Sequence, residues 1–174
     1  MKRNNNTVKI ITLVTLLAGA LCTPKVVEAK NTWELSLEAM GDESIDYDFS
    51  ASTGWLHTNY PEYEVSPIHR LMNCNYGVTF KFRRGTISAS HLVAAILQGL
   101  CSSVWGKPFQ PLEDVIAIGI SPKLDEIVFD APIKIDNQDE WNQPSAFDFC
   151  KKLAVKLGID FRWNDERQLY EFCP

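Results

Sequence analysis

The sequence lacks the motifs by which many enzymes are recognised. It has no glycine-rich phosphate loop, no nucleophile elbow around a serine and no CxxC pair, and it has only 3 histidines. It also has no low-complexity run and no apolar segment of the roughly 20 residues that a membrane-spanning helix needs. These absences argue against phosphate-binding, thiolate-metal and serine-nucleophile chemistry. The sequence therefore predicts a protein that is not an enzyme and that uses no cofactor.

The start of the chain has the regions of a secretory signal peptide in the usual order. Two basic residues open it, an apolar run over residues 10–22 follows, and Val27-Glu28-Ala29 places small residues where a signal peptidase reads them. We expect residues 1–29 to be removed and the mature protein to be periplasmic or secreted. A lipid-modified Cys22 is the alternative, but Leu21 before it is larger than the residue that bacterial lipoprotein signals place there.

The chain is acidic, with 17 Lys and Arg against 22 Asp and Glu and a net charge of -5. Residues 1–29 hold four basic residues and one acidic residue, so their removal would leave a net charge of -8. Such a chain repels nucleic-acid phosphates and anionic lipid, and we expect neither as a partner. The remaining length predicts one domain, residues 30–174, with its own core.

Four cysteines follow the predicted signal peptide: Cys74, Cys101, Cys150 and Cys173. An even number in an exported chain predicts two disulfides. Cys101 and Cys150 each lie on the apolar side of a predicted helix, which favours a bond between them and another between Cys74 and Cys173. Pairing of 74 with 101 and of 150 with 173 fits the spacings as well, so both connectivities remain open.

Residues 30–75 form an acidic, aromatic extension. Alternation of apolar and polar residues predicts strands over residues 33–38 and 45–49, joined into a hairpin by a turn at Gly41-Asp42. The segment 59–67 is typical of an irregular loop, because its prolines disfavour regular pairing.

The rest of the chain, residues 76–174, has alternating and helical patterns that predict an α+β fold. We expect two helices packed with a mixed or antiparallel sheet, extended by the N-terminal hairpin and closed by two disulfides. The predicted strands cover residues 78–82 (ended by Gly85), 115–120, 127–129, 133–135, 159–163 and 168–173. The predicted helices run from a cap at Ser88 or Ser90 to the break at Gly106, and from a start within residues 142–145, with Pro144 in the first turn, to Gly158.

Near the end of the chain, a helix closed by a glycine lies between an extended segment and a hairpin. The residues in question are Ile133-Lys134-Ile135-Asp136, the helix with Pro144-Ser145-Ala146-Phe147-Asp148-Phe149 and Leu153-Ala154-Val155-Lys156-Leu157-Gly158, then Ile159-Asp160-Phe161 and Leu169-Tyr170-Glu171-Phe172. This order resembles the small α/β module at the start of secretins and TonB-dependent transducers, and residues 78–100 are similar to its opening strand and helix. The resemblance implies a soluble accessory protein that docks to an envelope assembly, and it implies no catalytic residue.

An aromatic, proline-containing loop is one candidate for a protein-binding surface. It contains Trp55, Tyr60 and Tyr63 beside several carboxylates. Large aromatic side chains are typical interface anchors, and acids next to them would steer a basic partner. The same residues are equally typical of a loop that folds over a core.

A basic island is the second candidate. Lys81, Arg83 and Arg84 stand close together in an acidic chain. The guanidinium groups there could form bidentate hydrogen bonds with carboxylates of an acidic partner. They could equally pair with carboxylates of the acidic N-terminal segment of the chain itself.

Three further constellations have a structural explanation that we prefer. They are the histidines as a zinc site (His57, His69 and His91), Ser88, Ser90 and His91 with Asp114 or Asp125 as a nucleophilic triad, and residues 136–140 as a calcium loop. Their spacings are those of helix caps, solvated turns and acids near a helix start.

The expected function is thus binding of another envelope protein, as an accessory of a secretion, pilus or receptor assembly. The alternative is a periplasmic inhibitor or immunity protein against a toxin or cell-wall hydrolase.

Overall fold

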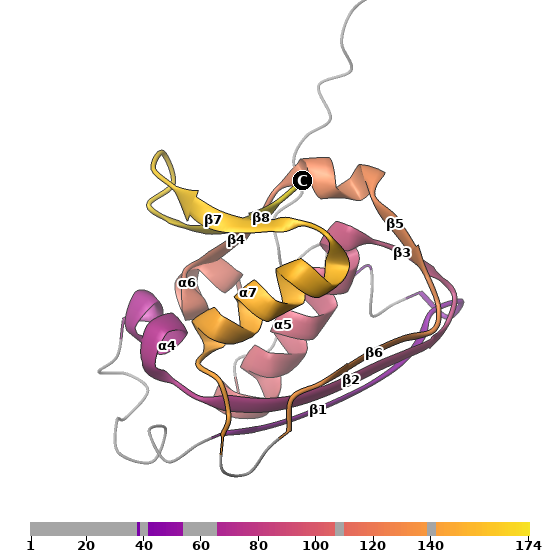
Figure 1. Cartoon of the computed structure of the whole chain (residues 1–174), viewed down its shortest axis with the longest axis horizontal. Helices are drawn as coiled ribbons and strands as arrows, with labels where there is room; N and C mark the ends of the chain where they lie inside the picture. Colours follow the sequence, from indigo (N-terminus) through magenta and orange to yellow (C-terminus); the bar gives the residue numbers. More distant parts are fainter. Residues whose placement is uncertain (1–37, 39–41, 54–65, 107–109, 139–141) are drawn as a thin grey trace, which may run out of the picture.

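The computed structural model describes residues 38, 42–53, 66–106, 110–138 and 142–174. Its elements in chain order are β1 (Asp46–Thr53), α4 (Pro67–Asn73), β2 (Tyr76–Arg84), β3 (Thr86–Ser88), α5 (Ala89–Trp105), α6 (Leu112–Ile116), β4 (Ile118–Ile120), the 3₁₀ helix η2 (Pro122–Glu126), β5 (Val128–Asp130), β6 (Ile133–Asp136), α7 (Ala146–Leu157), β7 (Asp160–Asn164) and β8 (Leu169–Cys173). In Figure 1, α5 and α7 lie between a sheet of order β1-β2-β6 and a sheet of order β4-β8-β7. The predicted α+β class is confirmed.

The first sheet is antiparallel and is centred on β2. Alternation along β2 buries Val78, Phe80 and Phe82 almost completely and leaves Lys81 on the opposite, exposed face. The strand predicted over residues 78–82 is therefore present. It ends at Gly85, whose φ of 113° is open to glycine and strained for other residues.

The second sheet is built around β8, which pairs antiparallel with β7 and parallel with β4. The predicted closing hairpin is confirmed. The strand predicted over residues 115–120 is wrong in its first half, because Val115 and Ile116 belong to α6. Ala117 has a left-handed φ of 53°, which ends that helix and leaves a strand of three residues.

Local capping chemistry explains where the two long helices begin and end. The Ser88 hydroxyl accepts from His91 N–H at the start of α5, and the Ser145 hydroxyl accepts from Asp148 N–H at the start of α7. Both helices end at a left-handed glycine, Gly106 and Gly158 respectively. Within the part of the chain that the structure describes, no helix combines the length and the apolar character that crossing a bilayer requires.

A close approach joins β1 to α5. The ring of Phe49 lies against Gly99, so that a Cβ atom on Gly99 would be only 2.8 Å from the ring. A glycine inside a helix is unfavourable by itself. Here its missing side chain lets the strand lie against the helix, and this contact helps to place β1 on the core.

The N-terminal expectations need two corrections. Of the predicted hairpin, the second strand is present as β1, which pairs with β2. Glu38, the one described residue of the first predicted strand, is helical, and residues 33–37 lie outside the described residues. The predicted irregular segment also ends in a helix, α4, whose N-cap is Ser66. A serine followed by proline is a helix-start signal that this stretch contained.

The disulfide prediction is not supported, since the four cysteines among the described residues are all free, buried thiols. Cys101 and Cys150 are completely buried on the core sides of α5 and α7. Burial raises the pKa of both thiols, and the nearby Cys101 raises that of Cys150 further. An even number of cysteines makes disulfides possible, but a bond forms only where the backbone brings two sulfur atoms to bonding distance. These residues pack instead as small apolar side chains.

Candidate protein-binding surface

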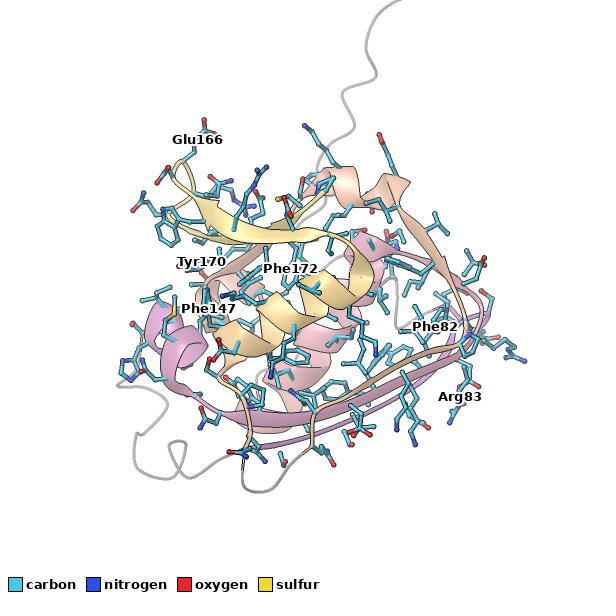
Figure 2. The ribbon with its side chains drawn as sticks, viewed as in Figure 1. Phe82, Arg83, Phe147, Glu166, Tyr170 and Phe172 are labelled. Carbon is cyan, nitrogen blue, oxygen red and sulfur yellow. The ribbon has the colours of Figure 1, made fainter. Side chains whose placement is uncertain are left out.

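Four aromatic side chains form a ledge along one flank of α7: Phe147 of the helix and Phe161, Trp163 and Tyr170 of the β7–β8 hairpin. The ring centroids of Tyr170 lie 4.9 Å from Phe147, 5.4 Å from Phe161 and 5.2 Å from Trp163. Figure 2 shows Phe147 and Tyr170 where the hairpin meets the helix. Trp163 is 39% exposed, so the outer end of this aromatic ledge reaches the surface.

The exposed side of α7 is basic. Lys151, Lys152, Val155 and Lys156 follow one another at the spacing of one helix side and are all exposed. Val155 is 82% exposed, more than the other large exposed hydrophobic residues among those described. The ammonium of Lys151 lies 5.4 Å from the centroid of the Phe147 ring, within range of a cation–π interaction. No ion pair within the described ranges uses these three lysines.

A groove of about 110 Å³ lies on the other flank of α7, between the helix and β6. Its apolar walls are Ile135, Phe149 and Leu153, and Lys152 and Lys156 stand among its lining residues. We refer to the ledge, the basic side of α7 and this groove together as the α7 surface. It combines apolar contact area with positive charge on a chain whose net charge is -5.

An arginine braces the hairpin from the face opposite the ledge. Arg167 pairs with Glu113 of α6 at 2.9 Å and with Glu171 of β8 at 2.8 Å, and Asn164 donates to the same Glu171. A Cβ atom on Gly119 would be 2.7 Å from the Arg167 guanidinium, so the glycine leaves room for this brace. These contacts tie the hairpin to α6 and β4 and hold the aromatic ledge in place. Sequence reasoning did not identify them, because their partners are up to 54 residues apart.

The basic island is engaged by the acidic strand of the chain itself. The Arg83 guanidinium donates to the carboxylates of both Asp46 and Asp48 on β1. These hydrogen bonds raise the pKa of Arg83, and the same contact lowers the pKa of Asp46. Arg83 of the basic island therefore pairs within the chain, with acidic residues of the N-terminal segment, which is one of the two alternatives that the sequence left open. Arg84 is exposed at the end of β2. The aromatic loop with Trp55, Tyr60 and Tyr63 lies outside the described residues.

The serines near the start of α5 do not form a nucleophilic triad with His91. The Ser90 hydroxyl is buried and donates to Asp125, while the Ser88 hydroxyl accepts the helix-capping bond. The His91 imidazole is directed elsewhere, with Nε2 3.2 Å from a Glu38 carboxylate oxygen. Because no imidazole among the described residues contacts either serine hydroxyl, this arrangement is not a nucleophilic triad; the bond from Ser90 to Asp125 ties η2 to α5.

The structure shows no metal site among the residues it describes. No group of three or more His, Cys, Asp or Glu side chains with suitable geometry is present there. In the proposed calcium loop, the Asp136 carboxylate is paired with Lys134 at 3.0 Å, and Asp139 and Glu140 lie outside the described residues. His57 lies outside them too.

Comparison of the chain with protein-family models, with curated proteins and with solved structures finds no match. The functional argument therefore depends on the α7 surface.

Proposed function

We propose that this chain is an exported, non-enzymatic protein that binds another protein of the cell envelope through its α7 surface. The observation that carries the proposal is the exposed side of α7, where Val155 is 82% exposed between lysines that form no described ion pair. Acidic groups of a partner would pair with these lysines, and the same contact would bury Val155.

The surroundings of Val155 support the same proposal. The aromatic ledge provides large, rigid side chains, which bury much area at a low entropic cost. Both the ledge and the basic side belong to regular elements that are capped at Ser145 and braced by Arg167. A surface on rigid elements is organised before its partner arrives, so less free energy is lost on binding.

The remaining polar side chains favour a binding protein over an enzyme. The Ser88 and Ser145 hydroxyls cap helices, and the Ser90 hydroxyl holds Asp125. The signal-peptide pattern over residues 1–29 supports export. The resemblance to the small α/β module also supports this role, and the segments on which it is based are β6, α7, β7 and β8 (Figure 1). An accessory of a secretion, pilus or receptor assembly is the role that these features support best.

Site-specific photocrosslinking in an exporting bacterium tests this function. A photoreactive amino acid at Val155 is expected to give a discrete crosslinked product with one envelope protein. The matched control is the same amino acid at Val128, a second exposed valine, which lies on β5 and is 57% exposed. Intact-mass analysis of the purified protein checks that the mature chain begins near Lys30 and carries no acyl group, whereas a retained, acylated Cys22 would indicate the lipid-anchored alternative.

The proposal is wrong if Val155 gives only the products that Val128 gives, or if the chain remains in the cytoplasm. Turnover of an envelope polymer by the purified protein would equally contradict the non-enzymatic role.

A further inference from the structure

β6 is an outer strand of its sheet, and one of its edges has no partner strand among the described residues. Asn137 N–H donates to the Val78 carbonyl of β2 at 2.9 Å, and the register continues with Ile135 also facing β2. Backbone groups of an antiparallel strand point to alternate sides. The N–H and C=O groups of Lys134 and Asp136 therefore point away from β2, and this edge is a short template for another strand.

The groove lies directly beside this open edge. Ile135 is only 5% exposed and lines the groove together with Phe149 and Leu153 of α7. A strand added next to β6 continues the sheet and directs every second side chain to the face on which α7 packs. Apolar side chains at those positions would enter the groove.

The rim of the groove is positively charged. Lys152 and Lys156 stand on its α7 side, and Asp136 is the only acidic residue in its lining. The Asp136 carboxylate is already paired with Lys134 at 3.0 Å, and this contact lowers the pKa of Asp136. The two lysines of α7 thus remain without a carboxylate partner within the described ranges, which favours an occupant that brings acidic groups.

We infer that an extended, acidic segment of the partner protein adds to the free edge of β6 as a further strand and places its apolar side chains in the groove. The inference rests on the proposed function and names the chemistry of the partner. Main-chain hydrogen bonds to Lys134 and Asp136 would provide affinity. The groove and its lysines would select apolar and acidic side chains.

A second copy of the chain suits the edge less well. Antiparallel pairing of two β6 strands would bring the α7 helices of both copies to the same side of the joined sheet. Lys152 and Lys156 of one copy would then approach those of the other, and like charges at such a contact are unfavourable. An acidic segment meets the same lysines with opposite charge.

The test uses the full mature chain and a blocked peptide in which every second residue is threonine and the positions between are alternately valine and glutamate, so that valine and glutamate share one face of an added strand. Its charge-reversed counterpart has lysine in place of glutamate. We expect the acidic peptide to bind at least about tenfold more tightly than the basic one. On binding, amide hydrogen exchange of Lys134 and Asp136 should slow, because their N–H groups gain carbonyl partners. The amides that already face β2 should change little.

Two variants test whether peptide binding depends on the free edge of β6 and on the lysines at the rim of the groove. Lys134→Pro removes an outward N–H from an edge strand, a position where proline is tolerated, and it should abolish peptide binding. Lys152→Glu should weaken binding by about fivefold, as expected for loss and reversal of one partly screened charge. Lys123→Glu, which changes an exposed lysine of η2, is the matched control and should leave affinity unchanged. Thermal melting shows whether each variant is folded.

Several results would overturn the inference. These are equal binding of both peptides, binding without protection of Lys134 and Asp136, and concentration-dependent dimerisation that protects those amides without peptide. Absence of peptide binding would also reject strand addition, while a specific Val155 crosslink would still support the proposed function. Loss of that crosslink with peptide binding intact would reject the proposed function and leave only a peptide-binding edge.

Discussion

The two long helices of the core differ in how they meet solvent. From Ala89 to Cys101, every residue of α5 is buried or half-buried, because strand β1, α6 and η2 pack around it. α7 buries only the side that contains Phe149, Cys150 and Leu153, and its other side is exposed. The first helix therefore acts as a scaffold, whereas the second presents a surface.

This difference shows where a binding surface can lie on such a fold. A helix that is apolar on all sides stabilises the molecule and has no side chain left for a partner. An amphipathic helix at the edge of the core contributes to stability with one side and carries exposed lysines and Val155 on the other. Changes on α5 should therefore alter stability, whereas changes on the outer side of α7 should alter only binding.

A matched pair of truncations gives the largest expected contrast. Leu97→Ala on α5 removes a side chain that is 0% exposed, and it should lower the free energy of unfolding by about 2–5 kcal/mol through lost burial and a cavity. Val155→Ala on α7 should change it by less than about 0.5 kcal/mol. Urea unfolding of both variants measures the difference. Similar losses in the two would mean that the outer side of α7 is not free.

The contact between Gly99 and Phe49 gives a smaller effect. Gly99→Ala places a Cβ atom 2.8 Å from the Phe49 ring, and the resulting shift of β1 should destabilise the protein by about 1–3 kcal/mol. In a Phe49→Leu background the same substitution should be neutral or stabilising, because alanine is the better helix former. Thermal unfolding of the double-mutant cycle measures the coupling. Equal effects in both backgrounds would show that the ring is not the obstacle.

The core sides of α5 and α7 should resemble each other in one respect, because each contains a buried thiol that makes the stability of the protein depend on pH. Burial raises the pKa of Cys101 and Cys150 in the folded protein, whereas thiols of the unfolded chain ionise with the ordinary pKa of 9.0. Their contribution to stability is therefore complete below pH 9 and is lost as the pH rises above it. Cys101→Ala and Cys150→Ala should each reduce this alkaline loss by about 1.4 kcal/mol per pH unit. Urea unfolding under reducing conditions measures the slope, and a change in only one variant would show that the two core sides differ.

Much of the fold follows from local patterns. The cap at Ser88, the closing glycines of both helices and the alternation along β2 each predict an observed element. Two signals were present and not used: the Ser66-Pro67 start of α4, and the lysines of α7 opposite its apolar stripe. The pairing of β1 with β2 had no local signal, because a strand at residues 46–53 alternates in the same way whichever strand it joins.

The candidate site was less predictable than the fold. Trp55, Tyr60 and Tyr63 stay candidates from the sequence alone. Arg83 was singled out by its charge, yet its charge is used by Asp46 and Asp48 of a neighbouring strand. The aromatic ledge assembles from a helix and a hairpin, and Phe147 and Tyr170 stand 23 positions apart in the chain. No spacing rule connects such residues.

The sequence by itself determined the ends of the two long helices, the strands β2, β7 and β8, the apolar side of each, and the acidic charge of the whole. These depend on capping, periodicity and composition, which act over a few residues. Only the tertiary structure decided which cysteines stay apart, which arginine is neutralised and which helix keeps a side in solvent. Those outcomes depend on distances between residues far apart in the chain, and packing sets such distances only when the whole core forms.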